Sequence, residues 1–589
     1  MRKLLPILFA ARLFAAATPP GNGYLVHNLT ADQTGVADFT DKNLVNPWGI
    51  DFSATGPFWV NDGGTGLSTV YTSSGSVATT FAIVPPGAGQ PSPSVATGIV
   101  FNGTGGFPVA AGRAPNFIFC TANGTISGWN SAVDATHAQL MVDNSASGAV
   151  YYGLAISGRT TDANPLIYVA NFKTGAIEVY DTNYKPATAA GGFTDSSVPA
   201  GYAPFNIWNI GGSLYVMYAQ QNPAKTGWVN GAGLGHVAVF DLTGKLVKHL
   251  ISGGALNAPW GVAMAGSNFG AFSGALLVGN FGDGKINAFD PKTGALMGTL
   301  ADPQGNPIQI PGLWALYPGN GGNGGDTNAI YFAAGGASQN HGILGSIQAA
   351  PVVAAGAVGN AANTQPVGIA QNTYISIYGA NLSPVTRTWG TSDFVGNKLP
   401  TALTGVSATV NGKPAYVYYV SPKQIDVLTP ADTATGSVNV VVTSGGLVSG
   451  TVSATMAAAS PALFLLKDNK SIAATHADGT LVGATTLYPG ASTPAKAGET
   501  IVLYATGCGQ TNPAFPDGQI VSTPLNLASP PTVSFNGTSA QVAYAGLVQA
   551  GVYQFNVVVP AGTAPGDVPV TIGTGSVSSA AGTIITVGQ

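Results

Sequence analysis

The chain has 589 residues, of which 7% are charged, and its formal net charge at pH 7 is −4. This length exceeds what one hydrophobic core usually serves, so we expect two or more domains. Its 20 Lys and Arg residues are scattered, and the absence of a basic stripe that would neutralise phosphates argues against a nucleic-acid partner. Gly is abundant at 82 residues, and Glu occurs only at Glu178 and Glu499, which is a turn-rich composition typical of an all-β protein.

The amino terminus has the pattern of a secretory signal peptide. Arg2 and Lys3 precede an apolar run, and a stretch of small residues ends at Ala17. Such a segment is removed during export, so we expect residues 1–17 to be cleaved and the protein to be secreted or held at the cell surface. Arg12 interrupts the apolar run, which leaves an ordinary N-terminal tail as the alternative. No later apolar stretch reaches the roughly 18 residues of a membrane-spanning helix, so no transmembrane segment is expected.

A strand-start motif recurs six times between residues 24 and 348. Its copies begin at Pro47, Ala96, Tyr151, Pro204, Pro259 and Pro311, with spacings of 49, 55, 53, 55 and 52 positions. Each copy is followed by a second apolar run, such as Leu276–Asn280, and most by a third, such as Ile286–Asp290. A period of about 50 residues with several strands per repeat is typical of a β-propeller. We therefore predict six blades, with Gly in the innermost strands because the blades converge there.

The sixth repeat ends early, after a third strand near Ile343 to Ile347. The segment Tyr24–Leu29 resembles the fourth strands Leu246–Leu250 and Leu296–Leu300. Placing it in the last blade would pair two open sheet edges at once. We therefore predict that the first strand of the mature chain closes the ring.

Residues 349–364 are Ala, Val, Gly and Asn without periodicity and are expected to form a linker. A second repeat follows, in which Ile375–Gly379 matches Ile501–Ala505, an offset of 501 − 375 = 126. Further pairs are Val410-Asn411-Gly412 with Phe535-Asn536-Gly537, and Gln424–Val427 with Gln554–Val557. Two copies of short alternating strands indicate two immunoglobulin-like β-sandwiches, at 365–458 and 459–589. The predicted fold is all-β, a six-bladed β-propeller followed by two such sandwiches.

Several motifs carry a resemblance to known families. The blade motifs Pro-Trp-Gly-[Ile/Val] and Ile-x-x-[Tyr/Phe]-Asp, together with Val169–Gly175, resemble NHL-type repeats. The span from Tyr24 to about Ile347 looks like an uncharacterised family of exported bacterial six-bladed propellers. Residues 459–589, with Tyr488-Pro489-Gly490 and Ala505–Gly509, look like the immunoglobulin-like C-terminal domain common in secreted acidobacterial proteins. These resemblances imply export, and neither family supplies a catalytic residue.

In a propeller, the starts of first strands and the ends of second strands meet at one mouth of the central channel, where we predict a ligand site. Aromatic rings beside amide groups suit a neutral polyhydroxylated ligand such as a glycan. The predicted ligand-binding residues are Trp48, Asn61, Asp62, Tyr152, Asn171, Phe205, Gln220, Trp260 and Asn280. The alternative is that the rings pack between blades while Asn and Asp cap turns.

No catalytic residue can be named from the sequence, and no metal site is predicted. A propeller hydrolase or lyase would need a metal, with calcium the best candidate, held by oxygens at the same mouth. Asp62, Asn171 and Asn280 could supply such oxygens, but the inner strands offer no evident acidic ligand or base. The chain has no Gly-x-Ser-x-Gly elbow and no His-Glu-x-x-His motif. Cys120 and Cys508 fall in different predicted domains, so no disulfide is expected.

We therefore predict an exported binding or scaffold protein without a cofactor, whose propeller face engages an extracellular glycan or protein ligand. The alternative is a metal-dependent hydrolase or lyase at the channel mouth. Three or more oxygen or nitrogen side chains converging on the axis would favour the enzyme.

Overall fold

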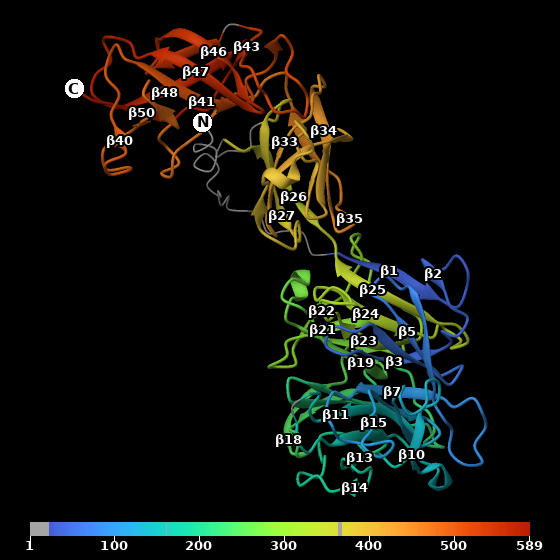
Figure 1. Cartoon of the computed structure of the whole chain (residues 1–589). Coiled ribbons are helices and arrows are strands. Elements are labelled where there is room, and N and C mark those ends of the chain that lie inside the picture. Colours follow the sequence, from blue (N-terminus) through green and yellow to red (C-terminus); the bar gives the residue numbers. More distant parts are fainter. Residues whose placement is uncertain (1–22, 161, 363–367, 530) are drawn as a thin grey trace. The chain divides into compact units, whose positions relative to one another are not determined.

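The computed structural model describes residues 23–160, 162–362, 368–529 and 531–589 (Figure 1). The predicted signal peptide, 1–17, lies outside these residues. The described chain forms two compact units, one spanning Gly23–Ala349 and the other starting at Ala350. Within the described ranges the helices are three single turns, η1 (Ser145–Ser147), η2 (Gly270–Phe272) and η3 (Thr391–Asp393). None of the helices in this part of the chain has the length and apolarity to cross a membrane.

Residues Gly23–Ala349 form six sheets, antiparallel except for the short pairing of β1 (Tyr24–Ala31) with β2 (Phe39–Thr40), and their first strands adjoin one another in a closed ring. The first strands are β3 (Pro47–Asp51), β7 (Ala96–Phe101), β11 (Tyr151–Ile156), β15 (Tyr202–Ile210), β19 (Pro259–Met264) and β23 (Leu313–Pro318). Strand β23 in turn contacts β3, which completes the circle. The predicted six-bladed propeller is confirmed.

Each blade continues outward through further strands in chain order. Blade one adds β4 (Phe58–Asp62), β5 (Leu67–Tyr71) and β6 (Val77–Ile83), and blade two adds β8 (Phe117–Thr121), β9 (Thr125–Trp129) and β10 (Gln139–Asp143). Blade three adds β12 (Ile167–Asn171), β13 (Ala176–Tyr180) and β14 (Pro186–Ala187), and blade four adds β16 (Ser213–Gln220), β17 (His236–Phe240) and β18 (Leu246–Ser252). Blade five adds β20 (Leu276–Asn280), β21 (Ile286–Phe289) and β22 (Leu296–Thr299).

The sixth blade is closed by the first strand of the described chain. Its order is β2-β1-β25-β24-β23, in which β1 (Tyr24–Ala31) pairs antiparallel with β25 (Ile343–Ala349). The two remaining strands are β2 (Phe39–Thr40) and β24 (Ile330–Ala334). Strand β1 also contacts the neighbouring blade one, because Thr30 Oγ1 donates a hydrogen bond to Gly75 O of that blade at 2.6 Å. The predicted closure is confirmed, and it leaves the final blade with its outer edge paired.

The inner strands pack so closely that four of the six blades have Gly at the contact position. A Cβ on Gly49 would lie 2.6 Å from Thr97 O, and one on Gly261 would lie 2.5 Å from Trp314 O. Blade four uses Asn206 instead, and its Nδ2 donates to Trp260 O at 2.9 Å. The expected crowding at the axis therefore decides the residue type of this position.

The start of the sixth repeat is corrected by the structure. Leu313 pairs with Ala334 as Pro259 pairs with Asn280, so the strand begins two residues after Pro311. Trp314 is therefore the counterpart of Trp260. The prediction failed because blade six has Ala at the close-contact position, while Gly312, with φ +69°, belongs to the turn before the strand.

The unit that starts at Ala350 contains two β-sandwiches, in agreement with the predicted fold class. In the first, one sheet has the order β26-β27-β33-β32-β28, with β28 at Arg387–Thr388, and the facing sheet is built on β30 and β34. Its principal strands are β26 (Val352–Asn360), β27 (Tyr374–Ala380), β30 (Val406–Val410), β32 (Tyr416–Val420), β33 (Gln424–Leu428), β34 (Gly436–Ser444) and β36 (Val452–Met456). Its apolar core includes Val353, Ile377 and Val440.

The segment 349–364 is not only a linker, because most of it is β26, which pairs with β27. Val353 and Val358 on this strand are buried in the sandwich core. A register shift between these two residues breaks the alternation of apolar residues. The sequence pattern was therefore hidden by a bulge around Gly356, whose φ is +69°.

The second sandwich repeats the first. Strands β41 (Thr500–Thr506), β47 (Val552–Val558) and β48 (Gly566–Thr574) take the places of β27, β33 and β34. The Asn-Gly pairs at 411–412 and 536–537 have positive φ at both residues, as two-residue hairpin turns require. The duplication inferred from the sequence is thus a duplication of strands and turns alike.

Candidate functional site

Aromatic side chains fill the channel mouth at which a ligand site was predicted. Trp48, Tyr152, Phe205 and Trp260 are each 5% exposed or less and belong to one apolar cluster. Trp48 stacks on Trp314 with ring centroids 3.4 Å apart and planes 17° apart. The prediction that these rings stack a ligand is corrected: they pack on one another across blades, because large apolar rings gain most from burial there.

Four of the five polar residues of the predicted site make side-chain hydrogen bonds within the fold. Asn61, Asp62, Asn171 and Asn280 are at most 1% exposed, and Gln220 is half-buried at the end of β16. The bonds are Asn61 Nδ2 to Gly98 O at 2.9 Å, Thr69 Oγ1 to Asp62 Oδ2 at 2.7 Å, Asn171 Nδ2 to Glu178 Oε1 at 2.6 Å, and Asn280 Nδ2 to Ala255 O at 2.8 Å.

The three oxygen donors considered for a metal are each buried and bonded to other groups of the protein. Asp62, Asn171 and Asn280 end the second strands of three different blades, and burial raises the pKa of Asp62 well above its usual range. Across the described ranges, no three His, Cys, Asp or Glu side chains gather in a way that could hold a metal ion.

An open pocket of about 480 Å³ lies at the carboxyl ends of the inner strands instead. All six blades contribute to its lining, because the first strand of each blade ends there. One contributor from each blade, in order, is Phe52, Phe101, Arg159, Trp208, Met264 and Tyr317. A site at this end of the ring is therefore built from residues spread over more than 260 positions of the chain, counting 317 − 52 = 265.

Three polar or amphipathic residues of this region occupy equivalent places in their strands. Asp51 in β3, Trp208 in β15 and Tyr317 in β23 each stand three positions after a buried aromatic residue of the channel cluster. The register of each strand shifts across its aromatic residue, so the directions of the side chains do not follow simple alternation. Tyr317 belongs to the same cluster as Trp314, and Trp208 packs against it. The repeated bulge therefore gives the three strands the same local structure at this position.

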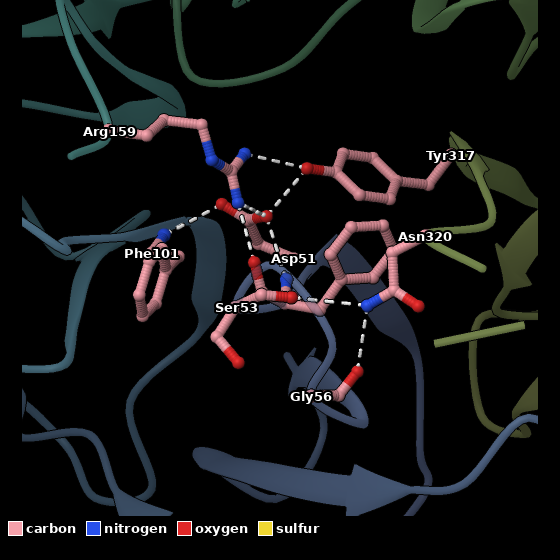
Figure 2. Close-up of polar contacts among 8 residues, drawn as sticks. Asp51, Ser53, Gly56, Phe101, Arg159, Tyr317 and Asn320 are labelled. Atoms are coloured by element: carbon pink, nitrogen blue, oxygen red, sulfur yellow. Dashed lines mark hydrogen bonds and ion pairs between the residues drawn. The ribbon is translucent and has the colours of Figure 1, made fainter. Parts of the chain in front are cut away.

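Asp51 and Arg159 are the centre of the polar cluster (Figure 2). Arg159 Nη2 donates to Asp51 Oδ1 at 2.6 Å and to Phe52 O at 2.6 Å, and Nη1 donates to Tyr317 OH at 2.8 Å. The Tyr317 hydroxyl donates to Asp51 Oδ1 at 2.6 Å, and Phe101 N donates to Oδ2 at 2.7 Å. The buried carboxylate is thus compensated by donors from three other blades.

A neighbouring bond fixes the loop after β3. Asn320 Nδ2 donates to Ser53 O at 3.1 Å and to Gly56 O at 2.9 Å (Figure 2). The wall of the pocket formed by blade one is therefore tied to blade six.

The electrostatics of the cluster keep a fixed cation at the pocket. Burial opposes the charge on Arg159, but Asp51 and Tyr317 outweigh it and raise the pKa of the guanidinium. Burial and the Asp51 charge raise the pKa of Tyr317 well above its usual range, so its hydroxyl stays protonated. The Asp51 side chain is 0% exposed, whereas that of Arg159 is 37% exposed. Positive charge faces the pocket while its counter-charge lies beneath.

The Arg159 guanidinium has a fixed orientation and carries N–H donors that make no hydrogen bond to the described residues. It lies over the Phe101 ring at 5.7 Å, and its Nε–H and second Nη1–H find no protein acceptor among the described residues. Half-buried Trp208 lies beside Tyr317 with ring centroids 5.3 Å apart. The pocket thus combines aromatic surface with unused charged donors.

Sequence reasoning missed Asp51, Arg159 and Tyr317. A usable signal existed, because Asp51 is an acidic residue inside a strand that is buried at all five positions and the chain is only 7% charged. A charge in such a place needs a partner. The partner itself was not accessible, since it comes from a loop 108 residues later.

Comparison with known proteins gives a matching domain family and two related proteins. Residues 365–456 match the IPT/TIG domain family. One uncharacterized protein of Acanthamoeba polyphaga mimivirus is 34% identical over 331 residues, covering 55% of this chain and 79% of that protein. A second from the same virus is 33% identical over 333 residues, covering 55% and 85%.

Solved structures similar to the chain include propeller proteins. A streptogramin B lyase has 12% identity and a TM-score of 0.34, covering 56% of this chain and 98% of the lyase. A glucose dehydrogenase has 12% identity and a TM-score of 0.35, covering 55% and 98%.

Proposed function

We propose that the propeller of this protein is a binding module. The chain belongs to the family of the uncharacterized mimivirus proteins just described. The ligand of the propeller occupies the pocket at the carboxyl ends of the inner strands. One observation carries this proposal. The Arg159 guanidinium is held by Asp51 and lies over the Phe101 ring, and it has N–H groups that no acceptor among the described residues uses, at a pocket with aromatic walls.

A glycan is the ligand class that we propose for this pocket. The half-buried ring of Trp208 offers apolar surface to one face of a sugar. The spare N–H groups of Arg159 suit sugar hydroxyls and, better, the carboxylate of an acidic sugar, because charge-assisted hydrogen bonds are the stronger ones. A volume of about 480 Å³ is in the range of pockets that hold small ligands.

We also propose that the protein is exported. The basic start and small-residue stretch before Ala17 support export of the protein, so we place the ligand outside the cytoplasm. The two sandwiches act as a scaffold in this proposal, which is supported by their compact apolar cores.

The experiment is a glycan array on the full chain, followed by titration of tryptophan fluorescence with the strongest binder. Ala54→Trp fills the pocket from an exposed position of its lining, and we expect it to weaken binding at least tenfold. Ala295→Trp is the matched control, since Ala295 is exposed in the turn before β22 and should leave affinity unchanged. Equal affinity of both variants, or no array signal for the folded protein, would reject the proposal.

A further inference from the structure

A β-bulge in the outer strand of blade four places a histidine and a serine on one side of the strand. His249 and Ser252 are three positions apart in β18, and residues at that spacing in a regular strand point to opposite faces. The register of β18 against β17 shifts between Ile251 and His249, which leaves Leu250 as the extra residue. The extra residue changes the alternation of side chains along the strand, so that His249 and Ser252 point to the same face.

The two side chains form a chain of hydrogen bonds with an aspartate from the loop between β14 and β15. Asp195 Oδ2 lies 2.6 Å from His249 Nδ1, and His249 Nε2 lies 2.7 Å from Ser252 Oγ. The Asp195 side chain is 1% exposed and that of His249 is 16% exposed, while Ser252 is exposed. A buried acid, a shielded imidazole and an open hydroxyl therefore follow one another from the inside outward.

The hydrogen-bond roles in this arrangement are fixed by chemistry. A carboxylate can only accept a hydrogen bond, so His249 Nδ1 carries a hydrogen and donates it in the hydrogen bond to Asp195. In the neutral ring Nε2 is then the acceptor for the Ser252 hydroxyl. The Ser197 N–H also donates to Asp195, at 2.9 Å, which holds the carboxylate in place.

A second histidine lies beside this arrangement. His236 lies beside His249 with ring centroids 5.4 Å apart, and the Tyr202 ring contacts His236 edge to face with centroids 4.7 Å apart. Burial, followed by the nearby His249, lowers the pKa of His236. The side wall of the arrangement is therefore uncharged.

Another carboxylate–histidine–hydroxyl set in this chain shows what is particular here. In the second sandwich, His476 contacts Glu499 through Nδ1, but its Nε2 lies 3.1 Å from the Thr493 carbonyl oxygen as well as 3.0 Å from Oγ1. A carbonyl can only accept, so this Nε2 carries a proton, and hydrogen bonds to Glu499 and Thr493 raise the pKa of the ring against the effect of burial. Nε2 of His476 must donate to a carbonyl, whereas Nε2 of His249 faces only the Ser252 hydroxyl among the described residues, and this hydroxyl can donate to it.

Backbone donors lie directly after the serine. Gly253 and Gly254 have φ values of +56° and +61°, a turn that most other residues would strain to adopt. Gly253 N donates to Gly235 O at 2.9 Å, whereas the N–H groups of Gly254 and Ala255 have no acceptor among the described residues. Two free N–H groups within three residues of Ser252 are the type of donor that stabilises an oxyanion.

We propose that Ser252, His249 and Asp195 form a catalytic triad that hydrolyses carboxylic esters at the outer edge of blade four. Ser252 Oγ attacks the ester carbonyl carbon and its proton moves to His249 Nε2, while the Gly254 and Ala255 N–H groups bond the oxyanion. The carbon–oxygen bond to the alcohol breaks, and the alcohol leaves with the proton from Nε2. Water then attacks the acyl-serine, gives a proton to Nε2, and the carboxylic acid leaves as Oγ recovers that proton.

The substrate is an ester whose acyl carbon can be approached from solvent, because Ser252 is exposed at the end of β18. Asp195 touches neither substrate nor product. It is a positioning residue that sets the tautomer of His249.

The test uses the full chain, a biotinylated fluorophosphonate and p-nitrophenyl acetate. We expect one fluorophosphonate per chain, mapped to Ser252 by peptide mass, and no adduct in Ser252→Ala. We expect both Ser252→Ala and His249→Gln to lower the ester hydrolysis rate by at least about 100-fold. Asp195→Asn should lower it while retaining adduct formation at a slower rate, because the nucleophile and base are still present.

Thr493→Ala is the matched control, because it removes the hydroxyl of the His476 set and should change neither labelling nor hydrolysis. Near-ultraviolet circular dichroism establishes that each variant is folded. Ser252 and His249 lie on the outermost strand of their blade, so both variants should pass this check. A folded wild-type chain that takes up no fluorophosphonate, or a Ser252→Ala variant with the wild-type rate, overturns the proposal.

Discussion

Asp51 in β3 and Arg159 in the loop after β11 join the first blade to the third through an ion pair of 2.6 Å. The carboxylate is buried and the guanidinium is 37% exposed. The pair therefore has two consequences: it neutralises a charge inside the ring, and it holds a cation at the edge of the pocket.

Replacing Arg159 by Met should destabilise the propeller by about 2–4 kcal/mol. The change leaves Asp51 buried without its partner, and the cost is less than for a fully buried pair because water reaches the guanidinium. Urea unfolding followed by circular dichroism measures the loss. The double variant Asp51→Asn/Arg159→Met should recover a large part of it, and a double variant as unstable as Arg159→Met alone would contradict this account.

Trp314 is a fully buried ring among the aromatic side chains that fill the channel mouth. Its side chain is 0% exposed and stacks on Trp48 at 3.4 Å. Trp314→Ala should cost roughly 3–5 kcal/mol, because it leaves a large cavity where six blades meet. The control Trp389→Ala removes a half-buried ring from the first sandwich and should leave the propeller's unfolding transition in place. Equal midpoints for Trp314→Ala and the wild type would show that the filling is not structural.

Asp426 in β33 makes the stability of the first sandwich depend on pH. Burial raises its pKa from 3.8 to about 6, against the effect of hydrogen bonds from Ser376 and Gln424. The folded state therefore holds the proton more tightly than the unfolded state. The free energy of unfolding should fall by about 3 kcal/mol as pH rises from about 4 to about 6, and stay constant above that.

Asp426→Asn should remove this slope. Both hydrogen bonds end on Oδ1, so the amide oxygen of the variant can accept them while the side chain carries no charge. Denaturant midpoints from pH 4 to 7 test the prediction, with a flat profile expected for D426N. A wild-type profile that is flat over the same range would be incompatible with a raised pKa.

The two thiols should resist modification in the native protein. Cys120 and Cys508 are both free and buried, and burial raises the pKa of Cys120 to about 11 and that of Cys508 further. Thiolate is the reactive form, so Ellman's reagent at pH 8 should detect almost no thiol before unfolding and two per chain in guanidinium chloride. Rapid reaction of one thiol in the folded chain would place it at a mobile position.

The repeats made most of the fold predictable. Pro259-Trp260-Gly261 and its relatives mark inner strands because a ring of blades imposes the same contact on each. The closing strand was found because Tyr24–Leu29 resembles fourth strands elsewhere. In the sixth blade the same approach misplaced the strand by two residues, since Ala315 occupies the position that Gly marks in four other blades.

The candidate site was not predictable in this way. The sequence placed Trp48, Tyr152, Phe205 and Trp260 near one another, which the apolar cluster confirms, but it assigned them to a ligand instead of to the channel filling. Whether a ring lies open or buried depends on what its neighbours from other blades cover, and Trp314 and Phe281 supply that cover. His249 and Ser252 were likewise out of reach, because a bulge at Leu250 is a property of strand pairing.

By itself, the sequence determined the class of structure, the number of blades, the duplication of the sandwiches and the positions of the inner strands in five of the six blades. These follow from periodic patterns, and each repeat carries its own copy of the signal. Only the tertiary structure decided which end of the ring is open, that Arg159 meets Asp51 and Tyr317 there, and that Asp195 meets His249. These contacts join single residues from distant parts of the chain. Because each contact occurs only once, no repeated sequence pattern indicates it.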